Sequence, residues 1–192
     1  MKVILNSRRI QQILKDLTGR IISEIGGQED IAIVGIRSRG EILGQRLSEL
    51  LSKRLKKDVP NGTLDITLYR DDLNSPPKNG QPQVRTTEIG FDIENKIIIL
   101  VDDVLYTGRS TRAAMDALID LGRPKAIKLA VLVERAGREF PIQADFVGYR
   151  AKLTPDESVQ VSLVESDGKD EVLINQTEEP ERKKSKIKVR KK

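Results

Sequence analysis

The sequence predicts an α/β domain whose central sheet is mainly parallel and is flanked by helices. Short runs of β-branched and aliphatic residues, typical of strands buried on both faces, alternate with amphipathic stretches of helical period. This alternation favours strands that are joined by helical crossovers and therefore lie parallel. Polar loops at 37–40 and 102–110 follow two of the apolar runs, at the sheet edge where ligands bind in such folds.

The first elements are a helix, a strand, a second helix and a second strand. The first helix is expected because apolar residues recur every three and four positions, at Ile10, Ile13, Leu14, Leu17, Ile21, Ile22 and Ile25. Asn6 or Ser7 is its N-cap, and Gly26-Gly27 ends it. The run 31–36 (IAIVGI) predicts a buried strand, and the second helix follows through Ile42, Leu43, Leu47, Leu50 and Leu51. The alternating residues 64–69 (LDITLY) predict another strand.

A long loop separates these elements from the second half of the domain. Residues 70–90 are polar and contain three prolines, and a loop of this length is usually functional or disordered. The most apolar strand follows at 96–101, and a helix from Arg109 to Leu121 is stopped by Gly122 and Pro124. Three further strands are expected, at 126–133, 145–149 and 159–164. Beyond about Asp167 the chain is expected to be weakly ordered.

Composition limits the chemistry that this chain can perform. The 192 residues include no Cys and no His, which excludes disulfides, thiolate metal sites, a Cys nucleophile and a His base. Catalysis must therefore use carboxylates, hydroxyls, Lys, Arg, backbone amides or an oxygen-bound ion such as magnesium. No apolar run approaches the roughly 18 residues of a membrane span, and the first residues do not resemble a secretory signal. We expect a cytoplasmic protein that does not bind membranes.

The net charge of +5 is concentrated in the last residues. Residues 181–192 hold eight Lys or Arg and one Glu, a net charge of +7, while residues 1–180 hold 26 basic and 28 acidic residues, a net charge of −2. Such a basic tail is most often a solvated extension. The alternative is a weak attachment to nucleic acid or another polyanion.

The segment 98–114 (IILVDDVLYTGRSTRAA) carries the most specific chemical pattern. A buried strand delivers Asp102 and Asp103, and a Thr-Gly turn then opens a helix. Gly108 lets the backbone approach an anion, and the free amides of a helix N-terminus with nearby hydroxyls form a phosphate cradle. Carboxylates beside such a cradle suit the hydroxyls of a sugar, so the pattern predicts a ribose 5-phosphate site. A nucleotide P-loop and a dinucleotide fingerprint are both absent.

The same segment resembles the phosphoribosyl pyrophosphate (PRPP) motif of type I phosphoribosyltransferases. The segment VDDVLYTGRSTRAAMDAL is most similar to the PyrR family, the bifunctional pyrimidine operon regulators and uracil phosphoribosyltransferases. Other similar stretches are VGIRSRG (34–40), LDITLYRDDL (64–73), MDALIDLGRPKAI (115–127) and LAVLVERAGREFPIQADFVG (129–148). The resemblance implies a type I phosphoribosyltransferase domain over 1–167, with a small hood and a flexible flap loop, and a weakly ordered basic tail over 168–192.

The resemblance also implies roles for individual residues. Asp102, Asp103 and Arg39 are the catalytic residues, and the two carboxylates hold the ribose hydroxyls of PRPP. The pyrophosphate is held by Ser38, Arg39 and Gly40. Further substrate-binding residues are Val104, Leu105, Tyr106, Thr107, Gly108, Arg109 and Ser110, of which the last five hold the 5-phosphate. Arg85 lies in the flap at 70–90, and the hood residues that present the base are Arg135, Phe146 and Val147.

The implied reaction joins uracil to PRPP and gives UMP and pyrophosphate, with Mg²⁺ carried by PRPP and no direct metal ligand in the protein. Many type I relatives have an acid where this chain has Tyr106, so help from a general base in the loop is in doubt. Two alternatives stay open. The protein is an RNA-binding or nucleotide-sensing regulator with little catalysis, or it transfers the phosphoribosyl group to another base, such as a purine.

The family's second activity is binding of pyrimidine operon leader RNA, tuned by UMP and UTP, which implies transcription regulation by attenuation. Lys15 and Arg138 are the expected RNA-binding residues. The pattern departs from the family at Lys15, Gly19, Gly137 and Gln143, which puts the RNA role in more doubt than the enzyme role. The family also implies a homodimer or a higher homo-oligomer.

Overall fold

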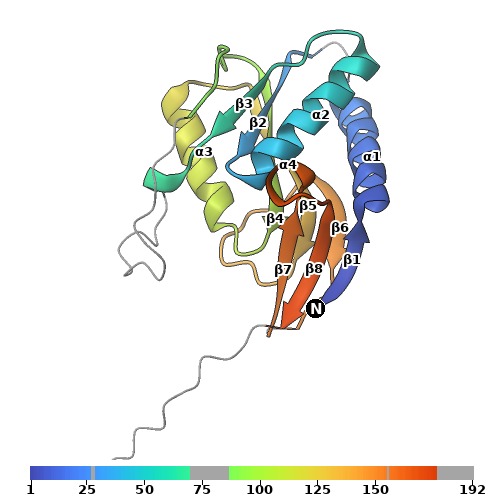
Figure 1. Cartoon of the computed structure of the whole chain (residues 1–192). Coiled ribbons are helices and arrows are strands. Elements are labelled where there is room, and N and C mark those ends of the chain that lie inside the picture. Colours follow the sequence, from blue (N-terminus) through green and yellow to red (C-terminus); the bar gives the residue numbers. More distant parts are fainter. Residues whose placement is uncertain (27–28, 70–86, 155, 177–192) are drawn as a thin grey trace, which may run out of the picture.

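The fold contains two β-sheets, one of five strands and one of three (Figure 1). The computed structural model describes residues 1–26, 29–69, 87–154 and 156–176. The larger sheet is parallel throughout and has the strand order β3-β2-β4-β5-β6. Its strands are β2 (Ile31–Ile36), β3 (Asn61–Leu64), β4 (Ile97–Leu105), β5 (Ala126–Arg135) and β6 (Phe146–Ala151). The predicted α/β class with a parallel central sheet is therefore confirmed.

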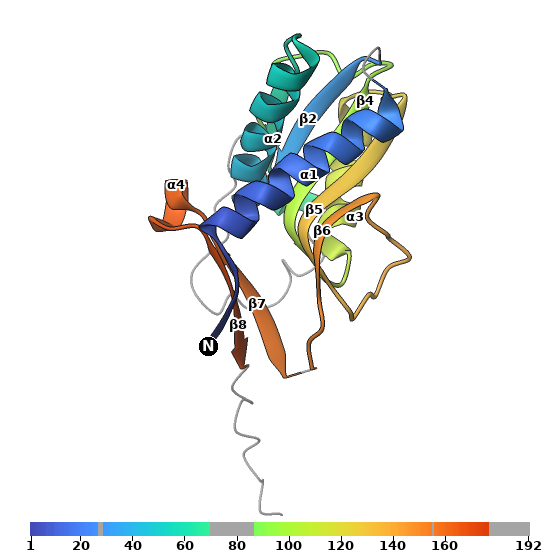
Figure 2. The ribbon, with the colours of Figure 1, turned by 90° about the vertical axis from the view of Figure 1, so that its right-hand side faces the viewer.

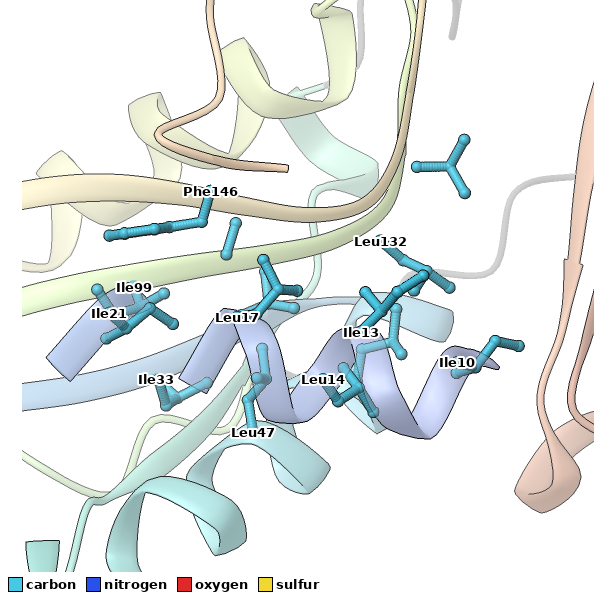
Figure 3. Close-up of a cluster of buried hydrophobic side chains, with 14 of the residues drawn as sticks. Ile10, Ile13, Leu14, Leu17, Ile21, Ile33, Leu47, Ile99, Leu132 and Phe146 are labelled. Carbon is cyan, nitrogen blue, oxygen red and sulfur yellow. The ribbon is translucent and has the colours of Figure 1, made fainter. Parts of the chain in front are cut away.

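Helices cover both faces of this sheet, as Figure 2 shows. One face packs against α1 (Ser7–Ile25) and α2 (Arg39–Leu55), and the other packs against α3 (Arg109–Leu121). The alternation of side chains along β4 explains both cores. Ile97, Ile99 and Val101 join the α1 and α2 side, whereas Ile98 and Leu100 join the α3 side. Figure 3 shows the first core, where the apolar stripe of α1 meets Ile99 of the sheet.

The helix ends follow the signals in the sequence. The side chain of Asn6 accepts a hydrogen bond from the Arg9 amide at 3.0 Å, so Asn6 is the N-cap of α1. Gly26, with φ of 85°, ends this helix, and Gly122 ends α3. In the described part of the chain, no helix has the length and apolar character needed to cross a membrane.

The second sheet joins the two ends of the described chain. It has three antiparallel strands in the order β1-β8-β7, with β1 at Lys2–Asn6, β7 at Glu157–Ser162 and β8 at Glu171–Gln176. A short helix, α4 (Val164–Asp167), connects β7 to β8. In Figure 1 this sheet lies beyond the ends of β4 and β5.

Two predictions differ from these elements, and one strand was not predicted. The strand expected at 64–69 is wrong, because β3 ends at Leu64 and a 3₁₀ helix, η1, follows at Thr67–Tyr69. The sequence also gave no indication of β1. The weakly ordered tail expected from 168 starts too early, because β8 pairs with a strand on each side and its Val172 is fully buried. Residues 177–192 and most of the expected flap lie outside the described residues.

Candidate active site

A cavity of about 250 Å³ opens at the carboxyl ends of β2, β3 and β4. Parallel strands present their carboxyl ends at one edge of the sheet, which is why residues far apart in sequence meet there. The walls are mostly polar and are formed by Ile36, Arg37, Ser38, Arg39, Asp65, Ile66, Thr67, Asp102, Asp103, Val104 and Ser110. The two loops that the sequence singled out, 37–40 and 102–110, therefore meet in one cavity.

Asp102 and Asp103 form a carboxyl pair inside the last part of β4. The strand is longer than its apolar run, so both residues lie within it, and Asp102 is paired with Val131 of β5. The Asp103 amide donates to Asp102 Oδ1, and the Val104 amide donates to Asp103 Oδ1, each at 2.9 Å. These backbone donors fix both carboxyl groups before any ligand arrives.

Burial controls the protonation of this pair. It raises the pKa of Asp102 well above its ordinary value, and the neighbouring Asp103 charge raises that pKa further. Burial also raises the pKa of Asp103, while its hydrogen bond with Asp102 and the nearby Arg39 charge act in the opposite direction. The pair therefore favours a ligand that supplies hydrogen-bond donors, such as the hydroxyls of a sugar.

The loop 37–40, whose last two residues begin α2, lies directly against the carboxyl pair. Gly40 approaches β4 so closely that a Cβ at this position would lie 2.5 Å from the Val101 carbonyl oxygen and 3.1 Å from Asp102 Cα. Only glycine fits this contact. The packing of Gly40 thus sets Ser38 and Arg39 beside Asp102 and Asp103.

Two arginines of this loop retain donors that can bind an anion. Arg37 and Arg39 line the cavity, and within the described residues their Nε atoms are buried without a hydrogen-bond partner. A buried N–H group without a partner is costly, so an anion in the cavity would be stabilised by these groups. Arg37 belongs to the loop 37–40 that the sequence singled out, but no binding role was predicted for it.

The turn from β4 into α3 has the conformation of an anion-binding loop. Gly108 precedes the helix with φ of 91°, a left-handed conformation that favours glycine. The Thr107 hydroxyl accepts a hydrogen bond from the Arg109 amide at 3.3 Å, and Ser110 in the first turn of α3 lines the cavity. Val104 also lines the cavity, whereas the Leu105 side chain is buried in the core on the α3 side.

Residues 136–142 cover this turn from outside. The Glu139 and Phe140 amides both donate to the Thr107 carbonyl oxygen, at 2.9 and 3.1 Å. The Arg109 guanidinium forms an ion pair with Glu139 and lies 5.4 Å from the centre of the Phe140 ring. The turn is therefore held from two sides, by the end of β4 and by this segment.

Arg135 and Tyr106 form a stacked pair next to the turn. The Arg135 guanidinium lies 4.1 Å from the centre of the Tyr106 ring, and it donates to the Glu157 carbonyl oxygen at 2.6 Å. Arg135 is buried, whereas Tyr106 is partly exposed. Arg135 thus joins the turn before α3 to β7 of the small sheet, and its role in presenting the base stays a prediction.

Phe146 and Val147 lie elsewhere than expected. They begin β6 and pair with Ala130 and Val131 of β5, several residues before the carboxyl end of that strand. Phe146 is fully buried against α1, and Val147 belongs to the core on the α3 side. Their side chains therefore lie in the two cores and do not line the cavity, and a role of these residues in presenting the base stays a prediction.

The two expected RNA-binding residues have separate surroundings. Arg138 donates to the Tyr106 carbonyl oxygen and, at 2.9 Å, to Glu134. Lys15 lies on α1 and lines a second cavity of about 440 Å³ between α1, α2 and α4. The predicted flap residue Arg85 lies outside the described residues.

Asp65 and Thr67 are cavity residues that sequence reasoning missed. Asp65 directly follows β3, and its carboxylate accepts hydrogen bonds from the Thr67 amide and hydroxyl at 2.9 and 2.6 Å. They were hidden because the strand was expected to extend to Tyr69. A strand ending at Leu64 would have placed Asp65 at the same sheet edge as Asp102.

Comparison with known proteins gives a consistent family. Residues 1–167 match the model of the phosphoribosyl transferase domain. The chain is 50% identical over 171 residues to the Bifunctional protein PyrR of Deinococcus radiodurans, covering 89% of this chain and 92% of that protein. It is 48% identical over 173 residues to the Bifunctional protein PyrR of Ligilactobacillus salivarius, covering 90% of this chain and 97% of that protein.

Solved structures support the fold. The hypoxanthine phosphoribosyltransferase of Trypanosoma cruzi superposes with a TM-score of 0.69 at 17% identity, over 93% of this chain and 98% of that chain. A hypoxanthine phosphoribosyltransferase of Staphylococcus aureus gives a TM-score of 0.62 at 22% identity, over 82% and 79% of the two chains. At these identities the likeness concerns the fold alone, and it confirms the predicted type I phosphoribosyltransferase architecture.

Proposed function

Because the chain belongs to the PyrR family of phosphoribosyltransferases, we propose that its cavity transfers the phosphoribosyl group of PRPP to uracil and releases pyrophosphate. One observation carries the assignment of the site. The buried Asp102–Asp103 pair, Arg39 and Ser110 line the same cavity at the carboxyl edge of the sheet. The cavity thus combines acceptors for a sugar diol with donors for a 5-phosphate and for a pyrophosphate, which are the three parts of PRPP.

In this proposal each wall of the cavity binds one part of the substrate. Asp102 and Asp103 accept hydrogen bonds from the ribose hydroxyls, because their carboxyl groups are buried and fixed by backbone amides. The turn from Tyr106 to Ser110 binds the 5-phosphate at the N-terminus of α3. Arg39, with Ser38 and the Gly40 backbone, binds the pyrophosphate, and Arg37 adds a second cation on that side.

The reaction is a displacement at C1 of the ribose. A ring nitrogen of uracil forms the new bond to C1, the bond from C1 to the pyrophosphate oxygen breaks with its electron pair, and the proton of that nitrogen passes to water or to the released pyrophosphate. The ribose becomes positively charged on the way, so the nearby carboxylates stabilise the transition state. Tyr106 stacks on Arg135, so this position supplies an aromatic surface instead of a carboxylate base.

Magnesium fits this site as part of the substrate complex. The described residues contain no group of three or more acidic side chains arranged to hold a metal ion, but three carboxyl groups, of Asp65, Asp102 and Asp103, line the cavity. Mg²⁺ is commonly held by substrate phosphates with one or two carboxylates and several waters. When bound with PRPP it would neutralise charge on the departing pyrophosphate.

Regulation by RNA is the second part of the proposed function. It is supported by the word bifunctional in the names of the relatives and by Arg138, a cation attached to the turn that binds the 5-phosphate in this proposal. UMP or UTP in the cavity would contact that turn, and pyrimidine operon leader RNA would contact Arg138 and Lys15. The cytoplasmic location and the homo-oligomeric state stay predictions.

The test is a panel of bases with PRPP and Mg²⁺, in which pyrophosphate release is measured. Uracil should give UMP and stoichiometric pyrophosphate, and hypoxanthine, guanine and adenine should give none above background. Release with a purine and not with uracil would show a phosphoribosyltransferase for another base. If no base reacts while UMP still strengthens binding of leader RNA, the protein is a nucleotide-sensing regulator with little catalysis.

A further inference from the structure

The turn between β7 and β8 is attached to α2 by two arginines. Arg39 and Arg46 are seven residues apart, which places them on one face of the helix two turns apart. Arg46 contacts Glu165 and Asp170, and Arg39 contacts Asp167. The turn 163–170 thus brings three carboxylates to two guanidinium groups, only one of which, that of Arg39, lines the active-site cavity.

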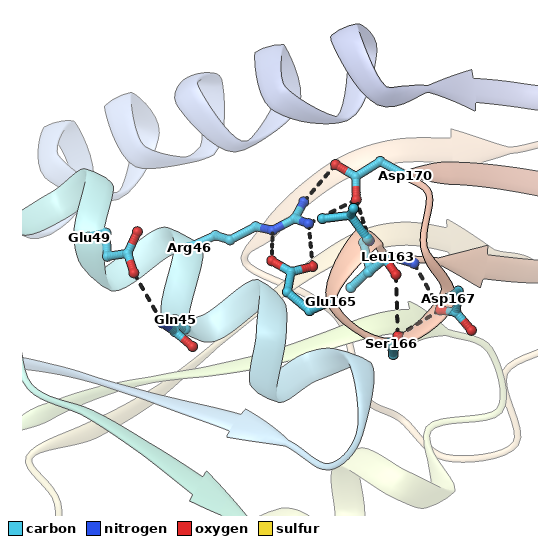
Figure 4. Close-up of polar contacts among 9 residues, drawn as sticks. Gln45, Arg46, Glu49, Leu163, Glu165, Ser166, Asp167 and Asp170 are labelled. Atoms are coloured by element: carbon cyan, nitrogen blue, oxygen red, sulfur yellow. Dashed lines mark hydrogen bonds and ion pairs between the residues drawn. The ribbon is translucent and has the colours of Figure 1, made fainter.

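Arg46 is fully engaged by this turn, as Figure 4 shows. Its guanidinium donates two hydrogen bonds to Glu165, at 2.8 and 2.6 Å, and two to Asp170, at 2.9 and 2.8 Å. Burial alone would lower the pKa of Arg46, but the bonds to the two carboxylates outweigh burial and raise it. This paired, four-bond contact anchors the turn on α2 without using the cavity.

Asp167 is itself fixed within the turn. Its Oδ2 accepts hydrogen bonds from the Leu163 amide at 2.9 Å and from the Ser166 hydroxyl at 2.7 Å (Figure 4). Leu163 is fully buried, so the amide that holds this oxygen is part of the core. Oδ1 remains directed to Arg39, whose Nη2 donates to it at 3.0 Å. The backbone bond from Leu163, the Ser166 bond and the Arg39 pair all lower the pKa of Asp167, so it is charged at neutral pH.

Arg39 is therefore placed between two sets of carboxylates. On one side Asp167 holds Nη2, and on the other side the Arg39 charge lowers the pKa of Asp103 in the cavity. The Nε atom is buried and has no hydrogen-bond partner among the residues that the structure describes. A long arginine side chain loses rotamer entropy when it binds an anion, and a preformed ion pair removes part of that cost.

We propose that Asp167 is a positioning residue, which holds the Arg39 guanidinium at the cavity for the pyrophosphate group of PRPP. The inference rests on the proposed function, because it assumes that Arg39 faces pyrophosphate. It links the small sheet to the reaction through one ion pair. A turn outside the sequence motif of the site thereby determines the geometry of a residue inside it.

The test compares Asp167→Asn with wild type at saturating uracil and Mg²⁺. The KM for PRPP should rise about 5–10-fold, while kcat should change by less than about threefold, because a mispositioned Arg39 mainly weakens substrate binding. Asp167→Glu keeps the charge and should recover part of the affinity. A PRPP KM within twofold of wild type in Asp167→Asn would overturn the proposal.

Two comparisons separate positioning from simple stability. Glu165→Gln removes a carboxylate from the same turn but leaves Asp170 on Arg46, and its PRPP KM should stay within about twofold of wild type. In an Arg39→Gln background, Asp167→Asn should have no further effect on the affinity for PRPP. An equal rise of KM in Glu165→Gln, or an undiminished effect in the Arg39→Gln background, would show that Asp167 acts through the stability of the turn.

Calorimetric binding of PRPP with Mg²⁺ distinguishes failure of this inference from failure of the proposed function. A protein that binds PRPP but makes no UMP contradicts the proposed activity, and its loss of PRPP affinity in Asp167→Asn would still support the role of Asp167. A wild-type protein that does not bind PRPP overturns both. An active wild type with equal PRPP affinity in Asp167→Asn overturns the positioning role alone.

Discussion

The Arg138 guanidinium donates a hydrogen bond to the backbone carbonyl oxygen of Tyr106. A residue expected to contact RNA is therefore bonded to the first residue of the turn that leads into α3. The other terminal nitrogen of this guanidinium, Nη2, donates to Glu134, which also accepts a hydrogen bond from Arg150. Any ligand that moves the turn at Tyr106 changes the position of Arg138 at the same time.

Replacement of Arg138 by alanine should affect both proposed activities. Loss of the bond to the Tyr106 carbonyl oxygen loosens the turn, so the affinity for UMP should fall about 3–10-fold, which corresponds to roughly one hydrogen bond. Affinity for leader RNA should fall as well. Calorimetry with UMP and filter binding with RNA measure the two effects. The control is Arg150→Ala, which removes the other arginine on Glu134 without touching Tyr106; a similar loss of UMP affinity there would contradict the role of the bond.

Double replacement of Asp102 and Asp103 by asparagine should weaken PRPP binding and leave the fold intact. Each lost charge-assisted hydrogen bond to the ribose hydroxyls is worth roughly 1.5–3 kcal/mol. Calorimetry with PRPP and Mg²⁺ gives the change in affinity, and circular dichroism gives the control for folding. Unchanged PRPP affinity in the double variant is incompatible with the assigned ribose site.

Asp102→Asn alone should stabilise the ligand-free protein at neutral pH. Burial raises the pKa of Asp102 above its ordinary value of 3.8, so the folded state binds this proton more tightly than the unfolded state. Wild-type stability therefore decreases as pH rises from about 3.8 through the raised pKa, and the asparagine variant lacks this loss. Thermal melts across that range should show a gain in Tm for the variant that is largest at neutral pH and shrinks toward acid. A variant less stable than wild type at neutral pH would contradict this reading of the site.

Arg46→Ala should destabilise the protein by roughly 1.5–3 kcal/mol, because the Asp170 carboxylate loses its guanidinium partner and keeps the hydrogen bond from the Val164 amide. The hydrogen bond from Arg46 lowers the pKa of Glu165, and for Asp170 burial is outweighed by the Arg46 and Val164 hydrogen bonds and the Arg46 charge, so its pKa is lowered too. The stabilisation from Glu165 and Asp170 is fully present at pH values above the ordinary pKa of a carboxyl group. It is lost as the pH falls through the lowered pKa values of these two residues. Urea unfolding at neutral and acid pH should show the difference from wild type closing in acid. Arg112→Ala, which removes the exposed pair with Asp116 on α3, should cost less than about 1 kcal/mol.

Truncation after Pro180 should separate non-specific from specific RNA binding. Residues 181–192 carry a net charge of +7, so their removal should weaken binding to all RNAs alike and flatten the salt dependence. Enzyme activity and any preference for leader RNA should remain. Filter binding to leader and scrambled RNA at two salt concentrations measures this. A preference that disappears with the tail would place specificity in the tail instead of the body.

The sequence predicted those elements whose signals are local. The strand at 31–36 and the helix at 109–121 agree with the structure residue for residue, because a continuous apolar run defines the first and Gly122 ends the second. β3 was misplaced because its residues, NGTL, begin with a pair that usually forms turns, while the alternation that follows belongs to a 3₁₀ helix. β1 and β8 pair with each other although they lie far apart in the sequence, so no local sequence pattern indicates this pairing.

The same distinction applies to the site. The loops at 37–40 and 102–110 were found because each follows an apolar strand and carries its own chemical pattern. Asp65 and Asp167 reach this region through tertiary structure alone. Asp65 follows β3, whose position was predicted wrongly, and Asp167 lies in a turn of the small sheet. Phe146 and Val147 were assigned from the family resemblance, whereas the strand predicted at 145–149 already places them at an amino end, away from the carboxyl edge where the cavity opens.

The pairing of β1 with β8 has a consequence for the order in which the parts of the protein fold. Lys2 is in register with Ile174, so the first strand of the chain has no partner on that edge until the last strand has been synthesised. The parallel sheet needs only residues between 31 and 151, and contacts so distant in sequence form slowly. The ion pair of Asp167 with Arg39 depends on the turn that precedes β8. A nascent or refolding chain would therefore form its central sheet first, and the small sheet, whose β7–β8 turn carries Asp167, only after β8 has been synthesised.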